Sequence, residues 1–170
     1  MRLGVTLVIA ALVSGSAACS AVDPDTGSAA GVGTWVHART GECAPVRTAS
    51  VEEFAEFVGP LRAELYAPFV AEWGTCSVAP YEKLGLVVFQ AGRMKDFQES
   101  WKAALASGQV TDNPDFAFGD GFALSATTGL ERLGLRYLHC TPVDATALSP
   151  EPAEADGCVY TAMVPGHHHH

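Results

Sequence analysis

The leader of this chain constrains its fold more than any other stretch, because it determines the compartment in which the cysteines react. Arg2 gives a positive start, residues 3–13 form an apolar run of signal-peptide length, and residues 14–18 are all small. The run is too short for the roughly 20 residues of a membrane-spanning helix. We therefore interpret residues 1–18 as a signal peptide, which places the rest of the chain where disulfides form.

The number of cysteines bears on what happens at the cleavage site. The chain has five cysteines, and modification of Cys19 would leave an even set, Cys43, Cys76, Cys140 and Cys158. The segment Ser16-Ala17-Ala18-Cys19 resembles the lipobox of bacterial lipoproteins, with Ser16 where leucine is usual, and the resemblance implies diacylglyceryl attachment at Cys19. The domain would then be anchored to the outer face of the cytoplasmic membrane; secretion after the same cleavage is the alternative. The high content of Ala, Gly and Val resembles the amino-acid composition of proteins from high-GC bacteria such as actinobacteria.

Four cysteines permit three pairings. We predict Cys43 with Cys76, because this pair brackets a helical segment, and Cys140 with Cys158, because this pair closes the base of a loop rich in proline, alanine and acidic residues. Each pairing closes a local unit.

Charge narrows the range of partners. Cleavage removes Arg2 from the ten Lys and Arg, and the nine that remain face nineteen Asp and Glu, a net charge of −10 with neutral histidines. Such a surface repels phosphate backbones and anionic headgroups. We expect no nucleic-acid partner, and attachment to the membrane through the lipid.

The mature chain has the length of one domain. Residues 19–33 are small and Gly-rich, which predicts a lipidated cysteine followed by a flexible tether. We expect the domain to occupy residues 34–166 and to begin with a short strand at Trp35 and Val36. Residues 167–170 are a His tail, either a purification tag or native.

Two helical units are predicted. Ser50-Val51-Glu52-Glu53 forms a capping box, in which the Ser50 hydroxyl accepts from the Glu53 amide and the Glu53 carboxylate reaches back to the Ser50 amide. Apolar residues then recur at helical spacing, and Gly59-Pro60 divides the helix into two pieces that end near Trp73. A second amphipathic helix is predicted to begin at Met94 and to end at Gly108.

Strands fill the remainder. Residues 84–91 predict a central strand covered on both faces, and Asp120-Gly121 predicts a type I′ hairpin. Further strands are expected over 133–140 and 159–164. The fold class is therefore α+β, an antiparallel sheet of about five or six strands with two helical units on one face, held by two disulfides.

Local signatures of catalysis are missing from the sequence, which contains no Gly-x-Ser-x-Gly, His-Glu-x-x-His or phosphate-loop motif. A nonlocal active site would need His37 or His139 as its base. Oxygen ligands for calcium gather at Asp112, Asn113, Asp115 and Asp120, although the same residues are ordinary turn formers. The terminal residues that suit a transition metal are His167, His168, His169 and His170.

We therefore expect a non-catalytic cell-envelope lipoprotein that binds a protein partner or a small ligand, and we assign no catalytic residue and no cofactor. One alternative is an envelope hydrolase with an active site near His139. The other is a metal-binding lipoprotein that uses the His tail.

Overall fold

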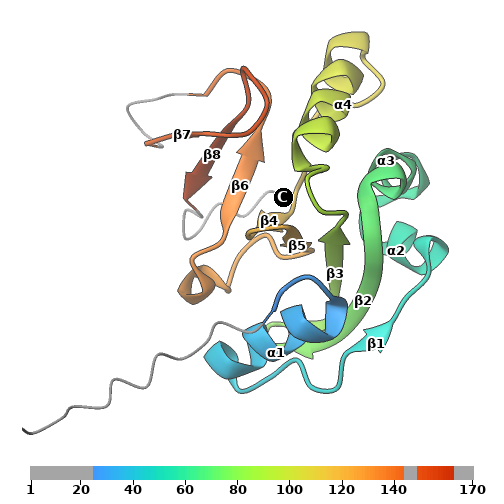
Figure 1. Cartoon of the computed structure of the whole chain (residues 1–170), viewed down its shortest axis with the longest axis vertical. Coiled ribbons are helices and arrows are strands. Elements are labelled where there is room, and N and C mark those ends of the chain that lie inside the picture. Colours follow the sequence, from blue (N-terminus) through green and yellow to red (C-terminus); the bar gives the residue numbers. More distant parts are fainter. Residues whose placement is uncertain (1–24, 144–148, 163–170) are drawn as a thin grey trace, which may run out of the picture.

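The computed structural model describes residues 25–143 and 149–162. Its eight strands form one antiparallel sheet in the order β1-β2-β3-β5-β4-β6-β8-β7, with helices against both faces (Figure 1). The predicted α+β class is confirmed, with more strands than expected. The helices are α1 (Ala29–Thr40), α2 (Val51–Val58), α3 (Pro60–Tyr66) and α4 (Met94–Ser107), with 3₁₀ turns η1 (Ala67–Phe69) and η2 (Glu131–Leu133). The strands are β1 (Arg47–Thr48), β2 (Val70–Val78), β3 (Tyr81–Phe89), β4 (Ala117–Phe118), β5 (Phe122–Leu124), β6 (Arg136–His139), β7 (Glu151–Pro152) and β8 (Val159–Ala162).

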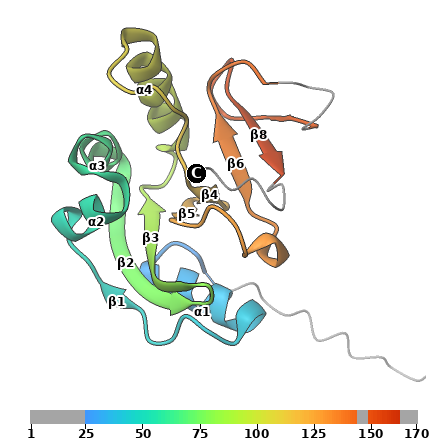
Figure 2. The same cartoon turned by 180° about the vertical axis from the view of Figure 1, so that it is seen from behind.

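The long β2–β3 hairpin lies between the edge strand β1 and the short strand β5 (Figure 2). Successive side chains of β3 point to opposite faces, so Val87 and Phe89 pack with α2, α3 and α4 while Leu84 and Leu86 pack with α1. We call the first side the aromatic face and the second the aliphatic face. The prediction that this strand is covered on both faces is confirmed.

The start of the domain differs from the prediction. Residues 29–33 of the expected tether and the expected strand at Trp35 belong to one helix, α1, whose Ser28 side chain accepts from the Gly31 amide at 3.1 Å. Gly33 faces the chain around Val46 so closely that a Cβ there would lie 2.0 Å from a Val46 methyl carbon. Glycines that weaken an isolated helix therefore allow this one to pack closely against the rest of the domain.

The predicted break at Gly59-Pro60 is confirmed. Ser50 caps α2 by accepting from the Glu53 amide at 3.2 Å, but the Glu53 carboxylate binds Arg47 and Lys83 and does not reach back to the Ser50 amide. Gly59 has a φ of 79°, which turns the chain before Pro60 begins α3. The helical unit ends at Phe69, earlier than predicted, because residues from Val70 onward pair with β3.

The C-terminal half contains the predicted hairpin, β4–β5. A type I′ turn needs a positive φ at both central residues. Gly121 has a φ of 74°, but the φ of Asp120 is not positive, so the turn is not type I′. Strand β6 pairs with β8, and β7 adds a short strand within the loop that Cys140 and Cys158 close.

Both predicted disulfides are present. Cys43–Cys76 lies in the aliphatic core, and Cys140–Cys158 lies beside α4 in the aromatic core. In the described part of the chain, no helix is long and apolar enough to cross a membrane.

Candidate functional site

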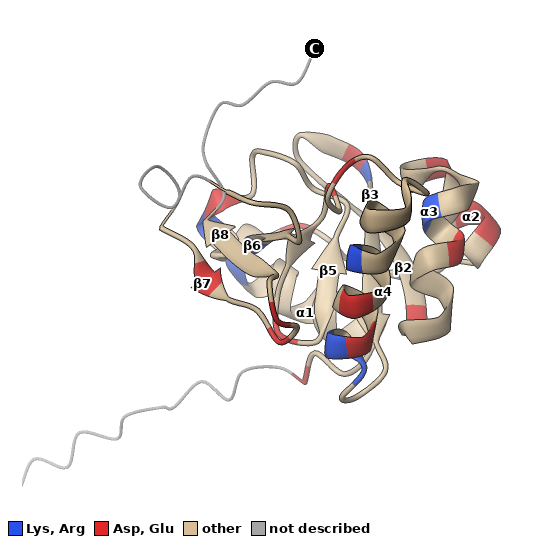
Figure 3. Ribbon diagram, turned by 90° about the horizontal axis from the view of Figure 1, so that it is seen from above, with Lys and Arg blue, Asp and Glu red and all other residues tan. Residues whose placement is uncertain are grey.

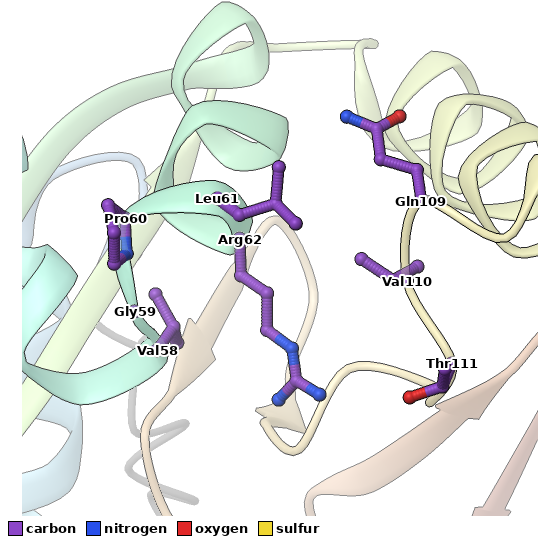
Figure 4. Close-up of a pocket in the computed structure, with 8 residues that line it drawn as sticks. All are labelled: Val58, Gly59, Pro60, Leu61, Arg62, Gln109, Val110 and Thr111. Atoms are coloured by element: carbon purple, nitrogen blue, oxygen red, sulfur yellow. The ribbon is translucent and has the colours of Figure 1, made fainter.

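A groove lies between the start of α3 and the segment that follows α4 (Figure 4). Its volume is about 280 Å³, and its lining residues are Val58, Gly59, Pro60, Leu61, Arg62, Gln109, Val110 and Thr111. Leu61 is 44% exposed, and among the described residues it is the only large hydrophobic residue on the surface. An apolar side chain left open to water beside a concave surface is typical of a binding site.

Two chain reversals build this groove. Pro60 starts α3 directly after Gly59, so Leu61 and Arg62 stand on the first turn of a short helix. Helix α4 ends at Gly108, and the Gln109 amide then bonds the Ala104 carbonyl at 2.9 Å, which directs the chain alongside α3. Val110 is 6% exposed and anchors the far wall in the core.

Arg62 supplies the charged wall of the groove. Its two terminal nitrogens donate to Asp112 Oδ2 and Asp115 Oδ2, each at 3.0 Å. The two aspartate side chains are 63% and 64% exposed, against 25% for Arg62. The carboxylate oxygens therefore remain accessible to a second basic group, and the cluster of one Arg and two Asp at the edge of the groove has net negative charge.

The carbonyl of Asp112 is held independently of its carboxylate. Trp101 of α4 donates from its indole nitrogen to that carbonyl at 3.0 Å, and the Thr111 hydroxyl donates to Asp112 Oδ2 at 2.9 Å. A rigid core residue thus fixes the position of the acidic wall. Pre-organised groups of this kind bind without a further ordering cost.

Tyr66 lies one helical turn after Arg62 and is 1% exposed. Its ring packs against Phe97 and Phe116, with centroids 4.8 and 5.3 Å apart. Its hydroxyl is the one buried side-chain N or O atom of the described residues without a hydrogen-bond partner. Burial raises the pKa of Tyr66 well above its usual value; Asp115 adds to this rise and Arg62 opposes it. The phenol stays neutral, and its hydroxyl leaves one buried polar group of the core without a hydrogen bond.

The residues considered for calcium are not brought together. Asp112 and Asp115 bind Arg62, whereas Asn113 donates to the Thr141 hydroxyl and accepts from the Cys140 amide. Asp120 lies in the β4–β5 turn, where its carbonyl accepts from Thr26. Within residues 25–143 and 149–162, no group of three or more His, Cys, Asp or Glu side chains is placed to hold a metal ion.

The two histidines lie apart from the groove. His139 Nε2 is 3.0 Å from the Thr161 hydroxyl, and burial lowers the pKa of His139 below its usual value. Thr161 is 2% exposed, so its hydroxyl is closed to a substrate. His37 lies near the end of α1, where its Nδ1 is 3.2 Å from the Glu42 carbonyl. Cys19 and His167–His170 lie outside the described residues.

A second concave surface of about 380 Å³ lies near the end of β8. Its charged groups already have partners: Arg136 donates to Glu151 at 2.8 Å, and Glu131 accepts from the Gly129 amide at 2.8 Å. The Arg136 guanidinium also lies 4.5 Å from the centre of the Tyr160 ring. This second surface also lacks an exposed large apolar side chain among its lining residues. The groove beside α3 is therefore the stronger candidate.

Sequence reasoning missed the groove. In the sequence, the Gly59-Pro60 pair indicates only a helix break, and the acidic residues after α4 indicate a turn or calcium ligands. Arg62 and Asp112 are 50 positions apart, so no local pattern signals their contact.

The fold and the groove define a class, an α+β domain held by two disulfides, with a surface groove whose lining residue Arg62 is paired with Asp112 and Asp115. No family model, no curated protein and no solved structure matches this chain.

Proposed function

We propose that this protein is a non-catalytic cell-envelope lipoprotein whose groove between α3 and residues 109–111 binds a partner. The lipid on Cys19 would hold it at the outer face of the cytoplasmic membrane. The observation that carries the binding role is the exposed Leu61 beside the Arg62–Asp112–Asp115 cluster. Two disulfides in the domain support an oxidising, extracytoplasmic location.

The chemistry of the groove indicates the kind of ligand. Val58, Leu61 and Val110 offer an apolar surface, and Asp112 and Asp115 offer carboxylates at its edge. A ligand with an apolar group next to a basic group would match both, because the apolar part loses contact with water while the cation meets net negative charge. A protein segment that pairs a hydrophobic residue with Lys or Arg has this chemistry, and so does an amphiphilic amine.

Site-specific photocrosslinking in the native envelope tests the proposal. A photoreactive residue at position 61 should give a discrete adduct, and Asp112→Asn with Asp115→Asn should reduce its yield. The same residue at position 91, which is exposed in the turn before α4 and does not line the groove, is the control. Equal adducts from both positions, or none from position 61, would contradict the assignment of the groove.

The hydrolase near His139 remains the alternative from another class. The contact between His139 and Thr161 pairs a base with a hydroxyl, but the hydroxyl is buried. Turnover of ester, peptide or glycan substrates that disappears in His139→Ala would favour this alternative. The metal-binding alternative depends on His167–His170, and metal uptake that survives their deletion would remove it.

A further inference from the structure

We propose that the outer side of α1 rests on the membrane surface, so that the groove beside α3 faces away from the lipid. The inference depends on the acylation of Cys19 in the proposed function. It adds the orientation of the domain and a second binding surface, whose occupant is the lipid headgroup layer.

Chain length supports this orientation. Asp25, where the described chain begins, is only six residues after Cys19, and six residues span at most about 22 Å. The chain is fixed to the domain soon afterwards, because the Ala29 amide donates to Glu72 Oε2 at 2.8 Å. A tether extending to residue 33 would reach about 50 Å. The shorter connection keeps the α1 side of the domain near the lipid.

Charge supports the same choice of surface. Of the four α-helices in the described chain, α1 alone carries no acidic residue, and its last turn contains His37 and Arg39. The acidic residues of α2 lie at one edge of the molecule (Figure 3). In a mature chain with net charge −10, this helix meets anionic headgroups with the least repulsion of the four.

Acidic side chains around α1 are engaged by backbone amides. Asp25 accepts from the Gly27 amide, Glu42 from the Ala79 amide and Glu72 from the Ala29 amide. Two further acidic residues lie near α1: Asp120, in the β4–β5 turn that contacts Thr26, and Glu131 of η2, which accepts from the Gly129 amide. Amide donors offset part of the negative charge that the first three present to the surface.

The side chains of α1 also suit an interface with lipid. The Arg39 guanidinium lies 4.1 Å from the centre of the half-buried Trp35 ring, which meets Phe122 edge-on with centroids 5.2 Å apart. Trp and Arg both combine an apolar body with a polar end, and both are favoured at headgroup level. Among the other exposed positions of α1, Ala30, Thr34 and Ala38 are small enough to let the helix approach a surface, and the remaining one is His37.

The groove lies on the other side of the domain. Helix α1 covers the aliphatic face of the sheet, whereas α3 and α4 cover the aromatic face. Figures 1 and 2 show α1 at one end of the molecule and α4 at the other. With α1 on the lipid, the groove opens toward the space beyond the membrane, where a protein partner can reach it.

Paramagnetic relaxation tests the orientation without altering the core. The acylated, isotope-labelled mature protein is placed on nanodiscs of phosphatidylcholine and phosphatidylglycerol that contain a gadolinium-chelating lipid. Amides of residues 30–40 should show enhancements severalfold larger than those of residues 58–62 and 109–111. Equal enhancements in both regions, or larger ones at the groove, would overturn the orientation.

A matched pair of variants tests the role of charge. Arg39→Glu should lower the time that α1 spends at the surface by roughly thirtyfold, because it changes the local charge by two units. Arg93→Glu makes the same change on the opposite face, where Arg93 lies 5.2 Å from the centre of the Phe69 ring, and should leave the pattern intact. An unchanged pattern in Arg39→Glu would contradict the electrostatic part.

The outcome also separates the two proposals. If intact mass shows no acyl group on Cys19 in the native envelope, both the anchoring and the orientation fail. If Cys19 is acylated and the enhancements are uniform, the orientation fails while the lipoprotein proposal stands.

Discussion

The two faces of the sheet bury different kinds of side chain. The aromatic face is built from rings, among them Phe54, Tyr66, Phe97, Trp101 and Phe116. The aliphatic face is built mostly from branched side chains under α1, among them Val32, Val36, Leu84, Leu86 and Leu124. Each core has one disulfide.

The two faces also differ in whether their buried polar groups have hydrogen-bond partners. Aliphatic side chains adapt to one another, and no buried polar side-chain atom of the described aliphatic face lacks a partner. Rings are rigid and fill space in few ways. On the aromatic face they leave the Tyr66 hydroxyl unpaired, and the exposed Leu61 groove opens beside it. Binding is therefore expected at the edge of the aromatic face.

Removing one ring should have the largest effect. Phe54 is fully buried and lies 4.2 Å from Trp73 between ring centres, so Phe54→Ala should lower the free energy of unfolding by about 3–5 kcal/mol. Val36→Ala on the aliphatic face removes fewer carbon atoms and should cost about 2 kcal/mol. Urea denaturation measures both. Equal losses of unfolding free energy in the two variants would show that the aromatic face does not depend more on a single side chain than the aliphatic face does.

Removing one disulfide should have the next largest effect. The pairs close loops of 33 and 18 residues, so chain entropy predicts losses of about 4 kcal/mol for Cys43→Ala with Cys76→Ala and about 3 kcal/mol for Cys140→Ala with Cys158→Ala. Thermal unfolding of the two double variants provides the comparison. A much larger loss for the shorter loop would mean that the docking of Cys140–Cys158 beside α4 outweighs loop closure.

Replacing Tyr66 or Tyr81 by phenylalanine should change the free energy of unfolding in opposite directions. Tyr66→Phe deletes an unpaired buried hydroxyl and should raise the free energy of unfolding by about 1 kcal/mol. On the aliphatic face, the Tyr81 oxygen accepts from the Thr127 and Thr128 amides at 2.8 and 2.9 Å. Tyr81→Phe should therefore lower the free energy of unfolding by about 1–2 kcal/mol. Destabilisation by Tyr66→Phe would show that its hydroxyl is satisfied in solution.

Acid should produce the smallest effect. Hydrogen bonds from Arg47 and Lys83 lower the pKa of Glu53 on α2 from 4.5 to about 2. Because the folded value lies below the unfolded one, the stabilisation is complete above pH 4.5 and is lost as the pH falls toward 2. Glu53→Gln should flatten this part of the pH profile of the unfolding midpoint. High salt should weaken the effect in the native protein, since these charges are exposed.

Local signals predicted the parts of the fold that local geometry determines. The Ser50 cap, the Gly59-Pro60 break, the β3 run and the β4–β5 turn position each follow from a few adjacent residues. Helix α1 was missed because its glycines disfavour an isolated helix, and only packing against the sheet reveals their use. The two-residue strands β1 and β7 exist only through pairing with β2 and β8.

The groove could not be predicted for a related reason. Its walls come from α3 and from a segment about 50 residues later, and the contacts between them depend on how both pack over the same sheet. Arg62, Asp112 and Asp115 are ordinary surface residues in the sequence. Their grouping beside Leu61 becomes visible only in three dimensions.

Native mass spectrometry of the protein extracted from its own envelope tests the binding role of the groove most directly. The wild-type protein should keep an added mass from a bound ligand or partner, and Leu61→Asp should lose it. Ala91→Asp places the same charge on an exposed position outside the groove and should keep the added mass. A wild-type protein without added mass, or one whose added mass persists in Leu61→Asp, would contradict the assignment of the groove as the binding surface.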